Sequence, residues 1–501
     1  MTTNAGVGRA EAGTALDHRR APLLEAVRRY AADGVVPFST PGHKRGAGID
    51  REYDDLFGGQ FLSLDIPLGG GVDDTHFGAD TLAKAATLAA AAWNADRSFF
   101  LVNGSSAGNH AYLLAALSPG DEVIVARDIH KSLLVALILS GAVPVYVAPR
   151  LHPDLDVGLG IDPADVAAAL DRHPEAKLVA LVSPSYCGVP SDVAAIAGVA
   201  HARGVPVYVD EAWGPHFGFH PALPPSAMVS GADGAVTSTH KVLGALTQSA
   251  LLSVRGDLVD PRRVKTAVGM AQTTSPSVPI LASIDACRRQ MALDGEALLE
   301  RTLGLAEDAR HRLRAIPGID VLGADQLGTA TYDPTKLVVD VHGLGLSGFE
   351  AEAVLRGRFR LQPEMSDLVG CVCLVTIADS AATIDRLVEA FATVARERDG
   401  GDARARERGV LRSSGAAIAP GRQALSPREA FFAPSHAVPL AEAAGCVSAE
   451  LVIPYPPGIP VLAPGDVIDA DKLTYLRDGA ARGMYLSGPA DGGLETIRVV
   501  V

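Results

Sequence analysis

Residues 231–256 read GADGAVTSTHKVLGALTQSALLSVRG, and two apolar runs in this stretch enclose a polar cluster. The runs GAVT and ALLSV have the composition of buried strands, so the cluster Thr237–Lys241 falls at the end of the first one. A lysine there either extends along its apolar stem to solvent or is held in a pocket, where it can form an imine with a carbonyl cofactor. The stretch alone leaves both interpretations open.

The same strand pattern extends outward from this stretch over residues 97–256. Short runs rich in Val, Ile and Leu alternate with amphipathic helical stretches; the strand-like runs include SFFLV, DEVIVA, VPVYVA, AKLVALV and VPVYVDE. Continuous aliphatic strands between helices predict an α/β fold with a largely parallel sheet covered on both faces. Ligands of such sheets bind beyond the carboxyl ends of the strands, where several polar clusters of this chain fall.

The remaining chain divides by composition into further segments. A long helical zone covers about 279–316, and a smaller α/β unit follows it. Residues 399–425 are rich in Gly, Ala, Ser and Arg, which is typical of a linker. We therefore predict an N-terminal segment, a large ligand-binding α/β domain, a small α/β domain, a linker and a C-terminal α+β domain, with the boundaries 1–75, 76–300, 301–398, 399–425 and 426–501.

Composition restricts the possible partners. The chain has 501 residues, 48% of them hydrophobic and 20% charged, and a formal net charge of −14, which argues against a nucleic-acid surface. The five cysteines are scattered and no second cluster completes a zinc site, so we expect reduced thiols and no metal. The N-terminus lacks the apolar core of a signal peptide, and Gly and Pro interrupt the apolar stretches. We expect a soluble, cytoplasmic protein without a membrane partner.

Two stretches could bind a phosphate and an aromatic cofactor. In VNGSSAGN (102–109) a strand is followed by a Gly-Ser-Ser turn and a helix, so Ser105, Ser106 and backbone N–H groups could hold a phosphate, or a serine could simply cap the helix. In YVDEAWGPHFG (208–218), Asp210 ends an apolar strand. It could face a pyridinium N–H, cap a helix or form a buried salt bridge.

Spacing adds two residues to this set. Lys241 lies 241 − 210 = 31 residues after Asp210, which leaves room for one element before the next strand end. His130, in RDIHKS (127–132), follows the strand DEVIVA and could stack on a flat ring or be a satisfied polar residue at a loop–helix junction.

Taken in order, these motifs carry a resemblance. NGSSAGN, DIHKS, SPSYCGV, VDEAWGPHF and STHKVLGALTQSA are similar to motifs of the fold-type-I pyridoxal-phosphate enzymes. With TPGHKRG (40–46), TTSPSVPILASIDACR (273–288) and SAELVIPYPPGIP (448–460), the chain more narrowly resembles the bacterial ornithine/lysine/arginine decarboxylase family from Pro37 to Gly465. It resembles a short form without the N-terminal wing domain, so the large domain is expected to bind pyridoxal 5′-phosphate.

The resemblance implies cofactor-binding roles. Lys241 would form the imine, Asp210 would pair with the pyridine nitrogen above Ala212, and His130 would stack on the outer face of the ring. The other implied contacts come from four serines, a histidine and a threonine: Ser105, Ser106 and Ser238 at the phosphate, His240 beside it, and Thr274 and Ser275 reaching a partner subunit's cofactor. One departure is Cys187 in SPSYCG, where relatives carry a different residue.

Substrate and reaction follow from the same resemblance. Glu450 would bind the distal cation of the substrate, with His43 as a further substrate-binding candidate. The implied reaction is decarboxylation of a small basic L-amino acid to an amine and carbon dioxide in a homodimer or a dimer of dimers. The resemblance favours arginine over lysine or ornithine, and Lys241 and His130 are both candidate proton donors.

Two other functions remain open at this point. An aminotransferase would need an arginine that clamps the α-carboxylate, and LRGRFRLQ offers Arg356, Arg358 and Arg360, unless these are solvated charges. A non-catalytic regulator is the alternative of another class, although the pair of Asp210 and Lys241 argues against it.

Overall fold

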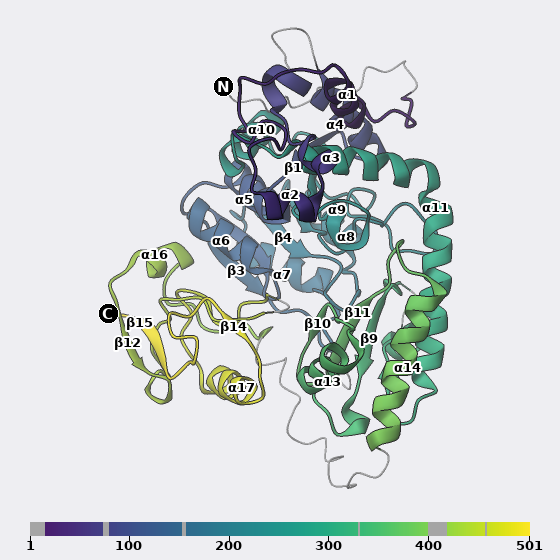
Figure 1. Ribbon diagram of the computed structural model, residues 1–501. Helices are drawn as coiled ribbons and strands as arrows, with labels where there is room; N and C mark the ends of the chain where they lie inside the picture. Colours follow the sequence, from purple (N-terminus) through teal and green to yellow (C-terminus); the bar gives the residue numbers. More distant parts are fainter. Residues whose placement is uncertain (1–15, 74–79, 153–156, 329–330, 399–417, 456–457) are drawn as a thin grey trace. The chain divides into compact units, whose positions relative to one another are not determined.

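The computed structural model describes residues 16–73, 80–152, 157–328, 331–398, 418–455 and 458–501 (Figure 1). The chain forms two compact units, the first comprising residues 1–116, 208–220 and 225–297, and the second residues 117–207, 221–224 and 298–501. The predicted segment boundaries stay a prediction, and residues 399–417 of the predicted linker lie outside the described residues.

The main sheet has seven strands in the order β1-β7-β6-β5-β4-β2-β3. Its strands are β1 (Arg97–Leu101), β2 (Glu122–Ala126), β3 (Val143–Val147), β4 (Leu178–Val182), β5 (Val207–Asp210), β6 (Gly234–Thr237) and β7 (Ala250–Val254). β2 runs parallel to β3 and to β4, and β5 runs parallel to β6, which confirms the predicted largely parallel sheet. β7 is the exception, since it is antiparallel to both β1 and β6.

The direction of β7 has a consequence for the first unit. Because β1 and β6 are both antiparallel to β7, and β5 is parallel to β6, the strands β1, β5 and β6 run in one direction. Their carboxyl ends therefore lie at the same edge of the sheet, where ligands of open α/β sheets bind. This unit also holds α1 (Pro22–Ala32), α2 (Arg51–Phe57), α3 (Gly59–Leu62), α4 (Thr81–Ala92), α5 (Gly104–Ala116), α9 (Thr239–Val242) and α10 (Pro261–Ala271).

In the second unit, α6 (Lys131–Ser140), α7 (Pro163–Arg172) and α8 (Val193–His201) accompany β2, β3 and β4. A four-stranded sheet follows in the order β10-β11-β9-β8, formed by β8 (Asp320–Val321), β9 (Lys336–Asp340), β10 (Met365–Ser366) and β11 (Gly370–Leu374). Leu313 of α11 (Val278–Arg314) and Phe391 of α14 (Ala381–Arg398) pack into one core with this sheet, and Figure 1 shows α14 alongside α11. The predicted long helix and small α/β unit are confirmed.

The C-terminal part of the second unit has its own core. This part of the chain contains α16 (Pro427–Phe432), β12 (Ser435–Pro439), β13 (Ile453–Pro454), α17 (Ala470–Ala481), β14 (Leu486–Ser487) and β15 (Thr496–Val500). Leu462, Leu476 and Ile497 lie in its core. The helices α12 (Ala324–Leu327) and α13 (Gly348–Val354) lie upstream, and Ala351 of α13 belongs to the core of the four-stranded sheet. The buried Arg127, just after β2, donates to the carbonyls of Pro460 (2.6 Å) and Val461 (3.0 Å).

Candidate active site

Asp210, at the end of β5, is a buried carboxylate with a defined set of donors. It is 3% exposed; Asn109 donates from Nδ2 to Oδ2 at 2.8 Å, and the Ala212 N–H donates to Oδ1 at 3.1 Å. Burial raises the pKa of Asp210, and the Asn109 hydrogen bond, the Lys241 charge and the Ala212 N–H oppose that rise. A protonated ring nitrogen would add the opposite charge that this carboxylate needs in order to be ionised.

Lys241 lies on the short helix α9, directly after β6. Its Nζ is 3.9 Å from the centroid of the Trp213 ring, so the ammonium lies over an aromatic face. Trp213 was not singled out from the sequence, because a cation–π contact leaves no spacing signal.

Three hydroxyls beside Lys241 are buried without a partner. Thr237, Ser238 and Thr239 are at most 2% exposed, and no described group hydrogen-bonds to Thr237 Oγ1, Ser238 Oγ or Thr239 Oγ1. Buried hydroxyls are normally satisfied, so three adjacent exceptions indicate a ligand that carries hydrogen-bonding atoms. A phosphate, with several acceptor oxygens, fits hydroxyl donors of this kind.

The start of α5 lies at the same edge. Ser105 and Ser106 occupy its first turn and are half-buried. A Cβ added at Gly108 would lie 2.6 Å from Cγ2 of Val236, so glycine permits the close approach of α5 to β6. Because β1, β5 and β6 end together, the structure brings Ser105, Ser106, Asp210 and the α9 segment to one edge of the first unit.

Three further predicted contacts lie in the first unit. Nδ1 of His240 is 2.8 Å from the Ser249 carbonyl oxygen, and burial is the main cause that lowers the pKa of His240. Thr274 and Ser275 are exposed in the segment between α10 and α11. Their predicted reach to a partner's cofactor stays a prediction.

His130 lies in the second unit, where it caps α6. Its Nδ1 is 2.7 Å from Ser132 Oγ and accepts from the Ser132 N–H at 3.2 Å. Gly458, from PYPPGIP, packs against the ring: a Cβ there would lie 3.0 Å from His130 Nε2, and the φ of Gly458 is +94°. The Lys131 N–H donates to the Gly458 carbonyl at 2.9 Å. Glycine thus lets the C-terminal loop hold the imidazole edge; Pro456 and Pro457 of the motif lie outside the described residues.

The two predicted substrate-binding residues have structural partners. Glu450 accepts from the Ala490 N–H at Oε2 and from the Arg498 N–H at Oε1, both at 2.9 Å. His43 contacts Asp65 (Nε2 to Oδ2, 3.2 Å) and accepts from the Gly46 N–H at Nδ1 (2.9 Å). Both carboxylate oxygens of Glu450 therefore already stabilise the backbone near β15, and the substrate roles of Glu450 and His43 stay predictions.

The remaining chemistry-bearing groups add no metal site. Burial raises the pKa of Cys187 to about 12, so its thiol stays protonated. Among the described residues, no group of three or more His, Cys, Asp or Glu side chains could hold a metal ion. Within the same residues, no helix combines the length and apolar character needed to cross a bilayer.

An α/β fold with a buried carboxylate, a lysine and unpartnered hydroxyls at one sheet edge is typical of pyridoxal-phosphate-dependent enzymes. The model of the Orn/Lys/Arg decarboxylase major domain matches residues 21–383, and that of its C-terminal domain matches residues 418–482. The chain belongs to the Orn/Lys/Arg decarboxylase family. It is an amino-acid decarboxylase whose cofactor is pyridoxal 5′-phosphate, and the predicted family, fold class and cofactor are confirmed.

Individual relatives agree with this assignment. The chain is 40% identical to an arginine decarboxylase of Halalkalibacterium halodurans over 96% of this chain and 97% of the relative. It is also 40% identical to an arginine decarboxylase of Bacillus subtilis, over 97% of this chain and 99% of the relative. The solved constitutive lysine decarboxylase of Escherichia coli shares the fold with a TM-score of 0.82 at 21% identity, covering 97% of this chain and 82% of that one.

Proposed function

We propose that the chain decarboxylates L-arginine in preference to L-lysine and L-ornithine, releasing the amine and carbon dioxide. The observation that carries the arginine preference is the 40% identity, over almost the full length, to relatives named arginine decarboxylases. A basic amino acid as substrate also agrees with the family description.

When bound, the cofactor supplies the electron sink for the breaking bond between Cα and the carboxylate carbon. In this proposal, Lys241 attaches the cofactor covalently, and the Asp210 carboxylate keeps the ring nitrogen protonated. Ser105, Ser106 and Ser238 would hold the phosphate. The buried, unpartnered Oγ of Ser238 supports the phosphate contact, and the Asn109 and Ala212 donors to the Asp210 carboxylate support its ionised form.

His130 and the substrate orientation complete the proposal. The hydrogen bonds of Nδ1 to Ser132 and the packing of Gly458 hold the imidazole in one orientation, as ring stacking requires. Orienting the scissile bond is the main task left to the protein, because proximity and orientation lower the barrier without new chemistry. A proton would then return to Cα from Lys241 or His130.

The surface arginines do not support the aminotransferase alternative. Arg358 forms a bidentate ion pair with Glu397 (2.6 and 2.8 Å), and Arg356 is bonded to Glu352 at 3.2 Å. Both arginines are more than half exposed. Two of the three candidates for a carboxylate clamp are thus engaged at the surface.

We further propose a homodimer in the cytoplasm, in which Thr274 and Ser275 reach the partner's cofactor. The first unit leaves large apolar side chains exposed, among them Val36 at 74%, Phe38 at 96% and Leu56 at 77%. A second copy of the chain would remove this surface from water. Sedimentation of the loaded protein measures the mass of the assembly, and cell fractionation measures its location.

The test of function is an amine-product assay with arginine, lysine and ornithine supplied separately. We expect the highest kcat/KM with arginine and no product from Lys241→Ala, whereas the exposed-lysine control Lys265→Ala should match the parent. Equal or better turnover of lysine or ornithine would overturn the arginine preference. Product formation by Lys241→Ala at the parent rate would overturn the assignment of the lysine.

A further inference from the structure

The second unit encloses a cavity of about 170 Å³ that none of the roles above uses. It lies where segments after β2 and β4 meet the sheet β10-β11-β9-β8, and its lining includes Asp128, Cys187 and Asp340. The volume is below the roughly 300–1,000 Å³ of pockets for drug-sized ligands, which favours a small ligand.

The polar lining of this cavity is acidic. Four carboxylates line it, those of Asp128, Asp320, Asp340 and Asp367, and the described lining residues include no lysine, arginine or histidine. Three of the four carboxylates already accept hydrogen bonds from other residues. Asp320 accepts from the Val321 N–H and Gln326, Asp340 from the His342 N–H, and Asp367 from the N–H groups of Val369 and Gly370.

Asp128 differs from the other three. It is 8% exposed, and within the described part of the chain no other residue hydrogen-bonds to its carboxylate. The neighbouring Arg127 hydrogen-bonds to Asp466 at 3.2 Å and to two backbone carbonyls rather than to Asp128, and its charge only partly opposes the effect of burial on the Asp128 pKa. Burial raises the pKa of Asp128 to about 6. A buried carboxylate of this kind is costly unless a cation or a donor approaches it through the cavity.

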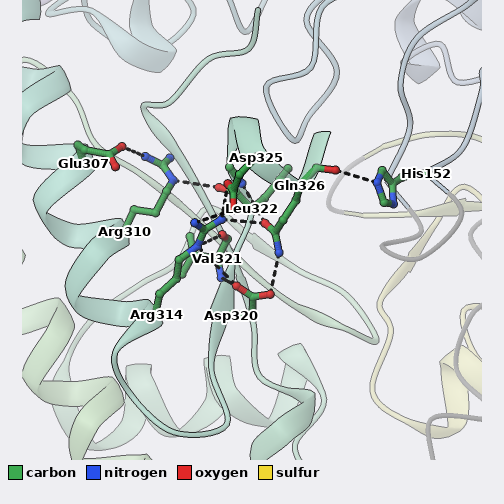
Figure 2. A network of polar contacts seen from close by, with 10 residues as sticks. His152, Glu307, Arg310, Arg314, Asp320, Val321, Leu322, Asp325 and Gln326 are labelled. Carbon is green, nitrogen blue, oxygen red and sulfur yellow. Dashed lines mark hydrogen bonds and ion pairs between the residues drawn. The ribbon is translucent and has the colours of Figure 1, made fainter. Parts of the chain in front are cut away.

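The walls around Asp128 combine apolar side chains with a rigid support. Val157, Leu322, Val338 and Ile459 contribute apolar surface that suits an alkyl chain. Figure 2 shows the polar network behind one wall: Arg310 Nε donates to the Leu322 carbonyl at 2.9 Å, and Arg314 Nε donates to the Val321 carbonyl at 2.7 Å. This support keeps the backbone of the wall in place without placing a cation in the cavity.

Gln326 connects this wall to a second segment. Its side-chain Nε2 donates to Asp320 Oδ2 at 2.7 Å, and its backbone carbonyl oxygen lies 3.0 Å from Nε2 of His152 (Figure 2). Both carboxylate oxygens of Asp320 therefore already accept hydrogen bonds from the protein, whereas no other described residue donates to Asp128.

We propose that this cavity binds a small organic cation, an ammonium or guanidinium group on a short alkyl chain, with the Asp128 carboxylate as its counter-ion. The inference deepens the proposed function and rests on it for the ligand class, since the side chain of a basic amino acid and the amine product both belong to it. Apolar walls receive the methylene groups, and the carboxylate supplies the charge-assisted hydrogen bond.

The first experiment measures binding without turnover. Agmatine, the decarboxylation product of arginine, is titrated calorimetrically into the cofactor-loaded full chain. We expect Asp128→Asn to weaken its binding at least tenfold, while Asp165→Asn, an exposed carboxylate of α7 outside the cavity, leaves it unchanged. Thermal unfolding of both variants shows whether they remain folded. Unchanged agmatine affinity in folded Asp128→Asn would overturn the proposal.

The second experiment identifies which cation the cavity receives. If it takes the side chain of the substrate, Asp128→Asn raises the KM for arginine at least tenfold with little change in kcat, and agmatine inhibits competitively. If it takes the free amine, the KM for arginine is unchanged, and non-competitive inhibition by agmatine disappears in the variant. Both results support a cation site at Asp128.

Failure of the two proposals can be told apart. A protein that binds agmatine through Asp128 but decarboxylates none of the three amino acids would overturn the proposed function and leave the cavity assignment intact. If the protein decarboxylates arginine normally but Asp128→Asn leaves the agmatine affinity unchanged, the cavity assignment is overturned and the proposed function stands.

Discussion

Polar side chains lie beside apolar strands in two regions: at the ends of β5 and β6, and around Glu450. The two regions differ in whether those polar groups have hydrogen-bond partners. Near Lys241, three buried hydroxyls have no described partner, and the pKa of the buried Asp210 is raised. Around Glu450, both carboxylate oxygens accept from backbone N–H groups. The adjacent unpartnered hydroxyls at the sheet edge favour a ligand site there, whereas the hydrogen bonds of Glu450 stabilise the local backbone, and its substrate role stays a prediction.

The largest expected effect is the loss of kcat in Asp210→Asn. Asp210→Asn removes the charge opposite the ring nitrogen, so we expect kcat to fall by about 10³-fold, within the range for losing a charged group that stabilises a transition state. Far-ultraviolet circular dichroism should be unchanged. Near-parental kcat with the cofactor loaded would make Asp210 structural and would move the site away from β5.

The second prediction concerns Asp128, the buried carboxylate of the cavity, and the pH dependence of the free energy of unfolding. The pKa of Asp128 is raised from 3.8 to about 6 in the folded protein, so its contribution favours folding below pH 3.8 and is lost as pH rises through about 6. Asp128→Asn should therefore raise the free energy of unfolding by about 3 kcal/mol at pH 7.5 and by little at pH 4. Urea unfolding at the two pH values measures the difference.

The outcome that would contradict this prediction is a variant destabilised at pH 7.5. In that case Asp128 would stabilise the fold as a charged group.

A third test compares two buried serines of the first unit. Ser238→Ala removes an unpartnered hydroxyl, so we expect cofactor affinity to fall about tenfold without loss of stability in the cofactor-free protein. The matched control is Ser253→Ala, whose hydroxyl is bonded to that of Ser98 at 3.0 Å. That variant should lose about 1 kcal/mol of stability and keep its cofactor affinity. Equilibrium dialysis of the cofactor and thermal unfolding separate the two effects.

The smallest expected effect is that of Glu450→Gln. An amide can still accept from one of the two N–H groups but places a donor against the other, so the free energy of unfolding should fall by about 1 kcal/mol. The KM for arginine should stay near that of the parent if the role is structural. A KM raised strongly for cationic amino acids, with unchanged stability, would instead support Glu450 as the ligand of the distal cation.

Several elements of the fold were accessible to sequence reasoning because their signals are local. Aliphatic strand composition located β1 to β7, and helical periodicity located α11 at Val278–Arg314 close to the predicted 279–316. Motif order pointed to the family and to the cofactor. The direction of β7 was not accessible, because an apolar run has the same composition whether its neighbours are parallel or antiparallel.

By itself, the sequence determined the α/β class, the family and the residue types that the chemistry needs, since these follow from short-range patterns. Only the tertiary structure decided which of those residues have partners. It placed Asn109 against Asp210 across a sequence separation of 101 residues and the backbone of Gly458 against His130. Within the described residues it also left the Ser238 hydroxyl without a partner and the Asp128 carboxylate without a hydrogen bond from another residue. Hydrogen bonding and burial depend on which distant segments meet, and no local pattern records that.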